Sequence, residues 1–164
     1  MRLTMRTTSA EETREVGEAL ASLLRMRDAV MLCGELGAGK TTFAQGVARG
    51  LGIEEQVSSP TFTLIKEYSG ILDLAHVDVY RLDMVQDVVD LGLEELGGGD
   101  DVLLVEWGDT IEELLPEERL RVELMTDDPA GESVRSISIS ATGTGWSDRF
   151  AELEAAMLPW GPNT

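Results

Sequence analysis

Hydrophobic residues form uninterrupted runs in two segments, residues 29–33 and 102–105. Such runs are typical of strands buried on both faces, as in a parallel sheet that helices cover. Around residues 120–124 and 137–139, apolar and polar side chains alternate instead, which predicts a hairpin with one solvated face. Residues 61–80 contain two extended runs about a Ser-Gly pair and predict another hairpin. The pattern therefore indicates both doubly buried and hairpin strands.

Apolar residues at helical spacing lie between these strands. Ser9 and Glu12 form a capping box ahead of a periodic stretch, which predicts a helix that ends near Arg27. A last helix is predicted to begin at Ser147. We expect a single domain over residues 1–164, peripheral or frayed at its two ends, residues 1–8 and 159–164. The other predicted helices cover residues 40–51, 84–91 and 111–115, and the last continues to residue 158.

A glycine-rich loop lies between the first apolar run and the helix predicted at residues 40–51. Its sequence, Gly34-Glu-Leu-Gly-Ala-Gly-Lys-Thr, matches the Walker A pattern throughout. Glycines allow successive backbone N–H groups to point at phosphate oxygens, and the helix N-terminus adds positive potential. The pattern predicts Lys40 at the β- and γ-phosphates, Thr41 as a Mg²⁺ ligand and Thr42 at the α-phosphate. An ordinary Gly-rich turn is the less favoured interpretation.

Two carboxylates are candidates for the metal and for water. Glu106 follows the apolar run 102–105 as the acid of a Walker B strand does, although Asp is commoner there. We expect it to bind Mg²⁺ directly or through water, and a solvated strand-end acid is the alternative. Asp78, between two valines, competes for this role or positions water. His76 is the only histidine, and the residues alone favour a structural role for it. The hydroxyl of Thr61 could sense a γ-phosphate, but the residues alone favour a structural role here too.

The composition restricts the partners. The chain has 164 residues and a formal charge of −18, from 13 basic and 31 acidic side chains. This length suits one domain. The acidic excess argues against non-specific binding to nucleic acid, which needs Lys and Arg at the phosphates. Only two of the basic residues are lysines, so Lys40 indicates a site where a compact ammonium group matters.

Cys33 is the only cysteine and lies inside an apolar run. It excludes an intramolecular disulfide and a cysteine-based metal site, and we expect a buried, inert thiol. The N-terminus lacks the basic and apolar regions of a signal peptide, and no apolar stretch approaches the ~20 residues that cross a bilayer. We therefore expect a cytoplasmic protein that does not bind membranes.

The remaining motifs restrict the reaction class. Asn163 is the only asparagine, so an Asn-Lys-x-Asp guanine-binding motif cannot exist. A P-loop small-molecule kinase usually has a lid with several arginines, whereas residues 60–81 contain only Lys66 and Arg81 as basic side chains. Such a segment supplies little positive charge to a transferred phosphate. ATP hydrolysis, or nucleotide-dependent binding with incidental hydrolysis, therefore fits better than a kinase.

Five sequence blocks together resemble the TsaE (YjeE) family, the ATPase of bacterial tRNA threonylcarbamoyladenosine synthesis. The first is the Walker A loop through Thr42. The combination of Ser-Pro-Thr-Phe, His-x-Asp-x-Tyr-Arg and Glu-Trp blocks makes the resemblance specific, because a Walker A motif occurs in many families. Besides the loop, the matching blocks occupy residues 59–63, 76–82, 91–94 and 104–107.

This resemblance implies a P-loop NTPase-like three-layer α/β fold. The central mixed sheet would have a parallel core extended by antiparallel strands, with helices on both faces. The implied cofactors are ATP and Mg²⁺, with Thr41 and Glu106 as the metal ligands. The implied catalytic residues are Lys40, Asp78, Glu106 and Thr61, the last as a switch residue. The nucleotide contacts, from the loop and from the resemblance together, would be Glu35, Leu36, Gly37, Ala38, Gly39, Lys40, Thr41, Thr42, Trp107, Ser9 and Arg135.

The family's partners are TsaB and TsaD, and TsaD transfers the threonylcarbamoyl group to an adenosine beside the anticodon. The resemblance implies that this chain binds their complex, resets it between turnovers and meets tRNA only through it. We expect slow hydrolysis until the partners bind, because no arginine finger is apparent in the chain. After Trp107 the sequence has Gly108 and Asp109 where the family commonly has proline, so the resemblance does not define that loop.

Overall fold

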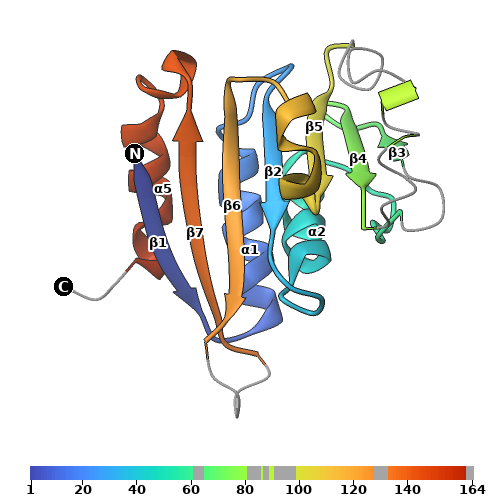
Figure 1. Cartoon of the computed structure of the whole chain (residues 1–164). Coiled ribbons are helices and arrows are strands. Elements are labelled where there is room, and N and C mark those ends of the chain that lie inside the picture. The colour runs from blue at the N-terminus through green and yellow to red at the C-terminus, as the bar shows by residue number, and fades with distance from the viewer. Residues whose placement is uncertain (61–64, 81–85, 87–88, 91–98, 128–132, 162–164) are drawn as a thin grey trace.

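The computed structural model describes residues 1–60, 65–80, 86, 89–90, 99–127 and 133–161. Their strands form one seven-stranded sheet in the order β1-β7-β6-β2-β5-β4-β3 (Figure 1). The strands are β1 (Arg2–Thr7), β2 (Ala29–Cys33), β3 (Ile65–Tyr68), β4 (Leu74–Asp78), β5 (Val102–Glu106), β6 (Arg119–Thr126) and β7 (Arg135–Thr142).

The centre of the sheet is parallel and its two sides are antiparallel. β2 pairs in parallel with both β5 and β6, and β4 pairs in parallel with β5. β7 is antiparallel to β1 and β6, and β3 is antiparallel to β4. Every residue of β2 and β5 is buried, as their uninterrupted apolar sequences predict. The mixed sheet with a parallel core and antiparallel extensions is therefore confirmed.

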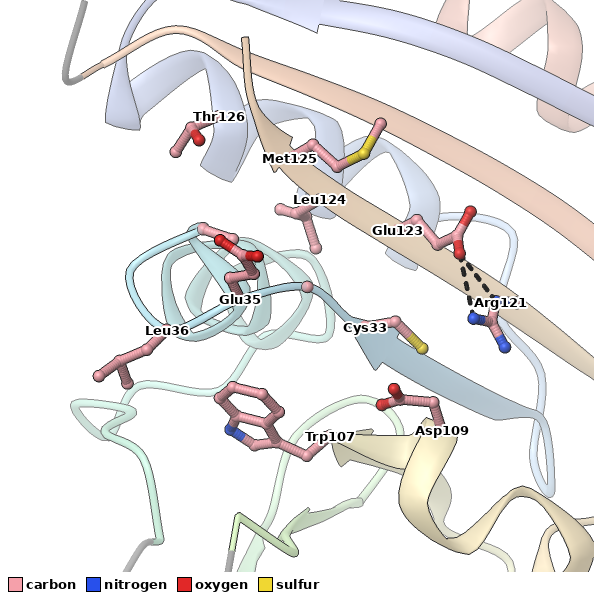
Figure 2. A pocket seen from close by; sticks show the side chains of 12 residues that line it. Cys33, Glu35, Leu36, Trp107, Asp109, Arg121, Glu123, Leu124, Met125 and Thr126 are labelled. Atoms are coloured by element: carbon pink, nitrogen blue, oxygen red, sulfur yellow. Dashed lines mark hydrogen bonds and ion pairs between the residues drawn. The ribbon is translucent and has the colours of Figure 1, made fainter. Parts of the chain in front are cut away.

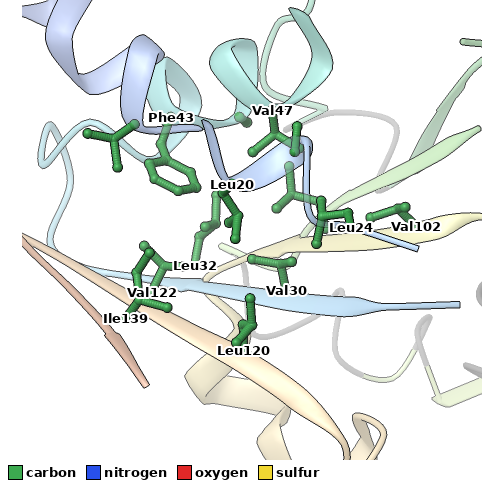
Figure 3. Close-up of a cluster of buried hydrophobic side chains, with 14 of the residues drawn as sticks. Leu20, Leu24, Val30, Leu32, Phe43, Val47, Val102, Leu120, Val122 and Ile139 are labelled. Atoms are coloured by element: carbon green, nitrogen blue, oxygen red, sulfur yellow. The ribbon is translucent and has the colours of Figure 1, made fainter. Parts of the chain in front are cut away.

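The helices α1 (Ala10–Ala21), α2 (Lys40–Gly50) and α5 (Phe150–Met157) cover one face of the sheet (Figure 1). Their apolar side chains pack on alternate strand residues, with Leu20, Phe43 and Val47 above Leu32 and Val122 (Figure 3). A 3₁₀ segment, η1 (Gly108–Leu114), lies over the opposite face at β2 and β5. The sheet thus separates two hydrophobic clusters of unequal size.

Two predicted helix boundaries were wrong. α1 ends at Ala21 and not near Arg27, because Leu23 and Leu24 continue as a tight turn bonded to the carbonyls of Leu20 and Ala21. This turn brings the chain back to the start of β2 at Ala29. Ser147 is not a helix N-cap, because it closes the 3₁₀ turn η2 (Thr144–Trp146), and α5 begins three residues later.

The helix predicted at residues 111–115 is the second half of η1, which ends before Pro116 as expected. The acidic helix predicted at residues 84–91 lies mostly outside the described residues. Its three described members, Gln86, Val89 and Asp90, have helical backbone and exposed side chains.

The N-terminal residues lie at the edge of the sheet, where β1 pairs with β7 along its whole length. Near the C-terminus, the 3₁₀ turn η3 (Leu158–Trp160) places Trp160 against the larger hydrophobic cluster. Among the helices that the structure describes, none has the length and apolar content to cross a bilayer.

Candidate nucleotide site at the ends of the parallel strands

The Walker A loop, residues 34–41, lies where the parallel strands end. It follows β2 directly and leads into α2 at Lys40. Parallel pairing places Glu106, the last residue of β5, beside Leu32 of β2 on one side and Asp78 of β4 on the other. Ligands of parallel α/β sheets bind at this edge. The fold therefore collects the loop, Glu106 and Asp78 in one place.

Two glycines of the loop are required by its geometry. Gly34 has φ +144°, and a Cβ there would lie 2.4 Å from the carbonyl oxygen of Leu124. Gly39, the N-cap of α2, has φ +103°, which residues with a Cβ rarely adopt. A side chain at Gly34 would collide with backbone that cannot move independently. Both positions therefore need glycine, as the Walker A pattern has it.

Lys40 is 5% exposed and points back over the loop. Its Nζ donates hydrogen bonds to the carbonyl oxygens of Gly34 at 2.6 Å and Glu35 at 2.8 Å. The same atom lies 3.7 Å from the ring centroid of Trp107, a cation–π distance. Burial lowers the pKa of Lys40, and the nearby carboxylate of Glu106 partly offsets this effect.

Glu106 is held by two side chains, one at each carboxylate oxygen. The hydroxyl of Thr41 donates to Oε1 at 2.9 Å, and Nε2 of His76 contacts Oε2 at 2.7 Å. Glu106 is only 2% exposed. The sequence predicted that Thr41 and Glu106 serve one site, and the structure brings them into direct contact. Among the described residues, no group of three or more His, Cys, Asp or Glu side chains could hold a metal ion alone.

Asp78 is buried beside Glu106 and accepts two hydrogen bonds. One comes from the hydroxyl of Ser59 and the other from the backbone N–H of Tyr80 at 3.0 Å. Ser59 lies two residues before Thr61, the expected switch residue, and Thr61 itself lies outside the described residues. The carboxylate of Asp78 therefore joins β4 to the segment that leads to the expected switch.

Trp107 has a left-handed backbone conformation, with φ +63°. Its ring lies 5.0 Å from that of Tyr80, measured between centroids. It also borders a pocket of about 550 Å³ between the Walker A loop and β6 (Figure 2). Glu35, Leu36 and Ala38 line this pocket from the loop, and Leu36 is 77% exposed. Trp107 thus lies beside Lys40 and the pocket, and its expected contact with nucleotide stays a prediction.

Arg135 is the first residue of β7, two strands away from β2 in the sheet, and its side chain contacts the Walker A loop. Its guanidinium donates to the carbonyl oxygens of Ala38 at 2.8 Å and Gly37 at 3.1 Å. The expected contact with nucleotide stays a prediction, but the side chain does bind the loop that would hold the phosphates. Thr42, also an expected contact, is half-buried in the first turn of α2.

Ser9 is confirmed as the N-cap of α1, where its hydroxyl accepts a hydrogen bond from the backbone N–H of Glu12 at 3.1 Å. The carboxylate of Glu12 accepts a hydrogen bond from the backbone N–H of Thr8 at 2.6 Å. Thr13, one turn later, lies 3.9 Å from the position that a Cβ on Gly39 would occupy. The start of α1 therefore lies beside the loop, but the observed bond of Ser9 is within its own helix.

Sequence reasoning missed His76 and Ser59 as members of this site. His76 precedes Asp78 by two residues on β4, so both side chains project from the same face of the strand. That spacing was available in the sequence. Ser59 contacts Asp78 from a separate loop, and no periodicity in the chain predicts that contact. Cys33 is buried as predicted, and burial raises the pKa of its thiol to about 11.

Comparison with known proteins shows the family. A model of the family described as "Threonylcarbamoyl adenosine biosynthesis protein TsaE" matches residues 7–136. The chain belongs to the TsaE family. Its relatives include the tRNA threonylcarbamoyladenosine biosynthesis protein TsaE of Bacillus subtilis, which is 45% identical over 92% of this chain and 93% of its own. The Streptomyces coelicolor TsaE is 43% identical over 88% of this chain and 98% of its own.

A solved structure confirms the fold of this TsaE family member. The crystal structure of Bacillus subtilis YdiB superposes with a TM-score of 0.80 at 42% sequence identity. The match covers 94% of this chain and 95% of YdiB. The P-loop NTPase-like α/β fold that the resemblance implied is therefore confirmed, and the chain has a role in tRNA threonylcarbamoyladenosine biosynthesis.

Proposed function

We propose that the chain is a Mg²⁺-dependent ATPase that binds and resets the TsaB–TsaD complex during tRNA threonylcarbamoyladenosine synthesis. The observation that carries the proposal is the 2.9 Å hydrogen bond between Thr41 and Glu106. It joins the hydroxyl that ends the Walker A loop to the carboxylate that ends a parallel neighbouring strand. P-loop NTPases hold their metal with a hydroxyl and a carboxylate in these two positions.

The residues at this position fit a Mg²⁺ ion. Mg²⁺ prefers oxygen ligands and keeps several waters, so one or two protein oxygens and the phosphates of a nucleotide suffice. Thr41 and Glu106 would supply the protein oxygens. When bound, the ion would neutralise negative charge on the β- and γ-phosphate oxygens.

Lys40 and the loop backbone would hold the phosphates. The ammonium group of Lys40 donates to two loop carbonyls, and in our proposal it exchanges these acceptors for β- and γ-phosphate oxygens. Its partial burial strengthens that interaction, because an ion pair is worth more in a low-dielectric surrounding than in water. The carbonyl contacts of Arg135 with Gly37 and Ala38 would keep the loop in its phosphate-binding conformation.

Hydrolysis joins the oxygen of water to the γ-phosphorus and breaks the bond between that phosphorus and the β-phosphate oxygen. ADP and inorganic phosphate leave. We assign Asp78 to orienting the water, because its buried carboxylate lies on the strand beside Glu106 and is itself oriented by Ser59 and the Tyr80 N–H. Thr61 would sense the γ-phosphate, and Ser59, two residues before it in the sequence, donates a hydrogen bond to Asp78.

Thr41 variants test the ATPase proposal directly. Thr41→Val removes the hydroxyl with little change of volume, and Thr41→Ser retains it. We expect Thr41→Val to lower the rate of Mg²⁺-dependent ATP hydrolysis by about 10²-fold, the scale of losing one charge-stabilising contact, and Thr41→Ser to retain most of the rate. Equal rates in both variants and the parent would contradict the proposal. With γ-labelled ATP, label in inorganic phosphate supports hydrolysis, whereas label in a small metabolite supports a kinase.

The partner assignment needs a separate experiment. The tagged chain is incubated with purified TsaB and TsaD, with ATP and without nucleotide, and captured. We expect co-capture of both proteins, with the yield dependent on ATP, and faster hydrolysis in the complex than in the isolated chain. A Lys40→Ala variant that sustains tRNA modification without binding or hydrolysing nucleotide would contradict the ATPase mechanism. An isolated chain as fast as the complex would contradict partner activation.

A further inference from the structure

His76 is buried at the centre of the site, yet no step proposed above uses it. It is the third residue of β4, and none of its surface is exposed. Its Nε2 lies 2.7 Å from Oε2 of Glu106, whose side chain is 3% exposed. The contact links two neighbouring parallel strands through their side chains, since His76 pairs with Leu104 two residues before Glu106. His76 therefore contacts the carboxylate of Glu106 from the protein interior.

The hydrogen bonding of His76 is one-sided. A carboxylate oxygen only accepts, so Nε2 carries the hydrogen in this contact. Nδ1 is buried and has no hydrogen-bond partner among the described residues. A buried polar atom without a partner lowers stability, and an apolar ring of similar shape would avoid that loss. Packing therefore does not explain a histidine here, whereas its hydrogen bond to Glu106 does.

Glu106 is a side chain that needs such a restraint. A glutamate has one more rotatable bond than the aspartate that commonly ends a Walker B strand, and its terminal torsion is broad. Thr41 restrains Oε1 only. With Oε2 bound to His76, both oxygens have defined positions, and Oε1 is directed at the loop hydroxyl. A preorganised ligand loses less freedom when it binds a metal.

We propose that His76 is a positioning residue, which fixes the Glu106 carboxylate so that it can serve as a Mg²⁺ ligand together with Thr41. This inference rests on the proposed MgATP function. Hydrogen bonds from a second residue orient metal ligands in many proteins, and their loss typically lowers metal affinity by about 10- to 100-fold. His76 would therefore determine how strongly Mg²⁺ tightens nucleotide binding, and would leave metal-free nucleotide binding unaffected.

The experiment compares three variants of the full chain. His76→Phe keeps a buried ring and removes both nitrogens, whereas His76→Gln retains an N–H donor at nearly the position of Nε2. Tyr68→Phe is the matched control, because it removes another buried polar atom without a described partner, in the same β3–β4 hairpin. The Kd of a fluorescent ADP analogue is measured with Mg²⁺ and with EDTA, and Tm is measured for each protein.

The ratio of interest is the Kd in EDTA divided by the Kd with Mg²⁺. We expect His76→Phe to reduce this ratio by about tenfold or more, because the Kd with Mg²⁺ rises and the Kd in EDTA stays the same. His76→Gln should restore most of the ratio, and Tyr68→Phe should match the parent. In a Glu106→Gln background, His76→Phe should have no further effect, because the histidine acts through that carboxylate. The Tm of His76→Phe should equal or exceed that of the parent.

Two results would overturn the inference. One is a parent-like ratio in His76→Phe. The other is equal loss in His76→Phe and His76→Gln together with a lowered Tm, which would assign His76 a structural role. If His76→Phe does not fold, His76→Leu takes its place, because it also removes both ring nitrogens, and it is measured alone and together with Glu106→Gln. Full additivity of these two changes contradicts action through Glu106. A parent that binds no nucleotide would overturn the proposed function itself, which distinguishes the two failures.

Discussion

The two sides of the sheet use polar side chains differently. At the carboxyl ends of β2, β5 and β4, the polar groups Lys40, His76, Asp78 and Glu106 are each at most 5% exposed and bonded to one another or to backbone. On the antiparallel side of the sheet, formed by β1, β7 and the edge of β6 that faces β7, ion pairs lie at the surface. An example is Arg6 of β1 with Asp127, which follows β6; their side chains are 62% and 45% exposed.

This difference distinguishes side chains that serve the proposed function from side chains that affect only stability. Buried polar groups lower stability unless they are fully bonded, so a cluster of four titratable ones at one edge of the sheet indicates a site. The buried polar side chains of β1 and β7, Thr7 and Ser138, are uncharged hydroxyls. Exposed ion pairs contribute little, because water and salt screen them. The antiparallel strands stabilise the fold through their apolar face, and Arg135 joins them to the Walker A loop by hydrogen bonds.

The largest effect is expected from Lys40→Ala. Losing the buried ammonium group should slow ATP hydrolysis by about 10²- to 10³-fold, while Tm changes by only a few degrees. The matched control is Lys66→Ala, which removes the other lysine of the chain. Lys66 is exposed on β3, with its Nζ 5.0 Å from the ring centroid of Tyr68. Steady-state hydrolysis and thermal unfolding distinguish the two. Equal losses of hydrolysis rate in both variants would contradict the distinction between the buried site and the exposed surface.

A stability effect without a functional one is expected at Arg149. Its guanidinium lies 2.6 Å from a carboxylate oxygen of Asp28 and 3.8 Å from the ring centroid of Trp146, with 9% of its side chain exposed. Arg149→Ala leaves Asp28 without this buried partner and should lower the free energy of unfolding by roughly 3 kcal/mol.

The measurement is urea unfolding, with the Kd for nucleotide measured under native conditions. We expect the Kd to match that of the parent, since Arg149 precedes α5 and no described contact joins it to the loop. A changed Kd with unchanged stability would reverse the assignment of this cluster.

Arg135→Ala tests the connection between the two sides of the sheet. Loss of its bonds to Gly37 and Ala38 should weaken nucleotide binding by about tenfold, or about 1.4 kcal/mol. Arg135→Lys should restore only part of the affinity, because a lysine cannot reproduce the planar guanidinium fork. Titration calorimetry with ADP measures the effect. A parent-like affinity in Arg135→Ala would show that these bonds from β7 do not support nucleotide binding.

The smallest effect is expected at Arg6 on the edge strand β1. Its ion pair with Asp127 spans 3.2 Å but is exposed. Arg6→Ala should change the free energy of unfolding by less than about 0.5 kcal/mol and leave nucleotide affinity unchanged. Urea unfolding at low and high salt checks this. A loss above about 1 kcal/mol that persists in high salt would show that this side of the sheet depends on its polar contacts after all.

Much of the site could be predicted because its signals are local. The glycines of the Walker A loop, Lys40 and Thr41 are consecutive or nearly so, and a loop of eight residues contains its own conformational requirements. Glu106 could be predicted as the residue that ends an apolar strand. The end of α1 could not, because the apolar pair Leu23 and Leu24 suits a helix and a buried turn equally.

The roles of His76 and Arg135 depended on distant partners. His76 begins one of the blocks that carry the resemblance, but only the pairing of β4 with β5 places it 2.7 Å from Glu106, 30 residues away. Arg135 bonds to Ala38 across 97 residues. Ser147 satisfied the local rule for a helix N-cap, yet the chain starts α5 at Phe150, after a 3₁₀ turn that the sequence rule did not anticipate.

By itself, the sequence determined the class of fold, the Walker A loop and the family resemblance, because hydrophobic periodicity and short motifs are local properties of the chain. Tertiary structure alone decided which buried groups meet, since strand order and register bring Thr41 to Glu106 across 65 residues. Hydrogen bonds form only within about 3 Å, so no local pattern specifies them. The −18 charge argued against direct nucleic-acid binding, and the structure located the buried polar groups on which the proposed chemistry depends.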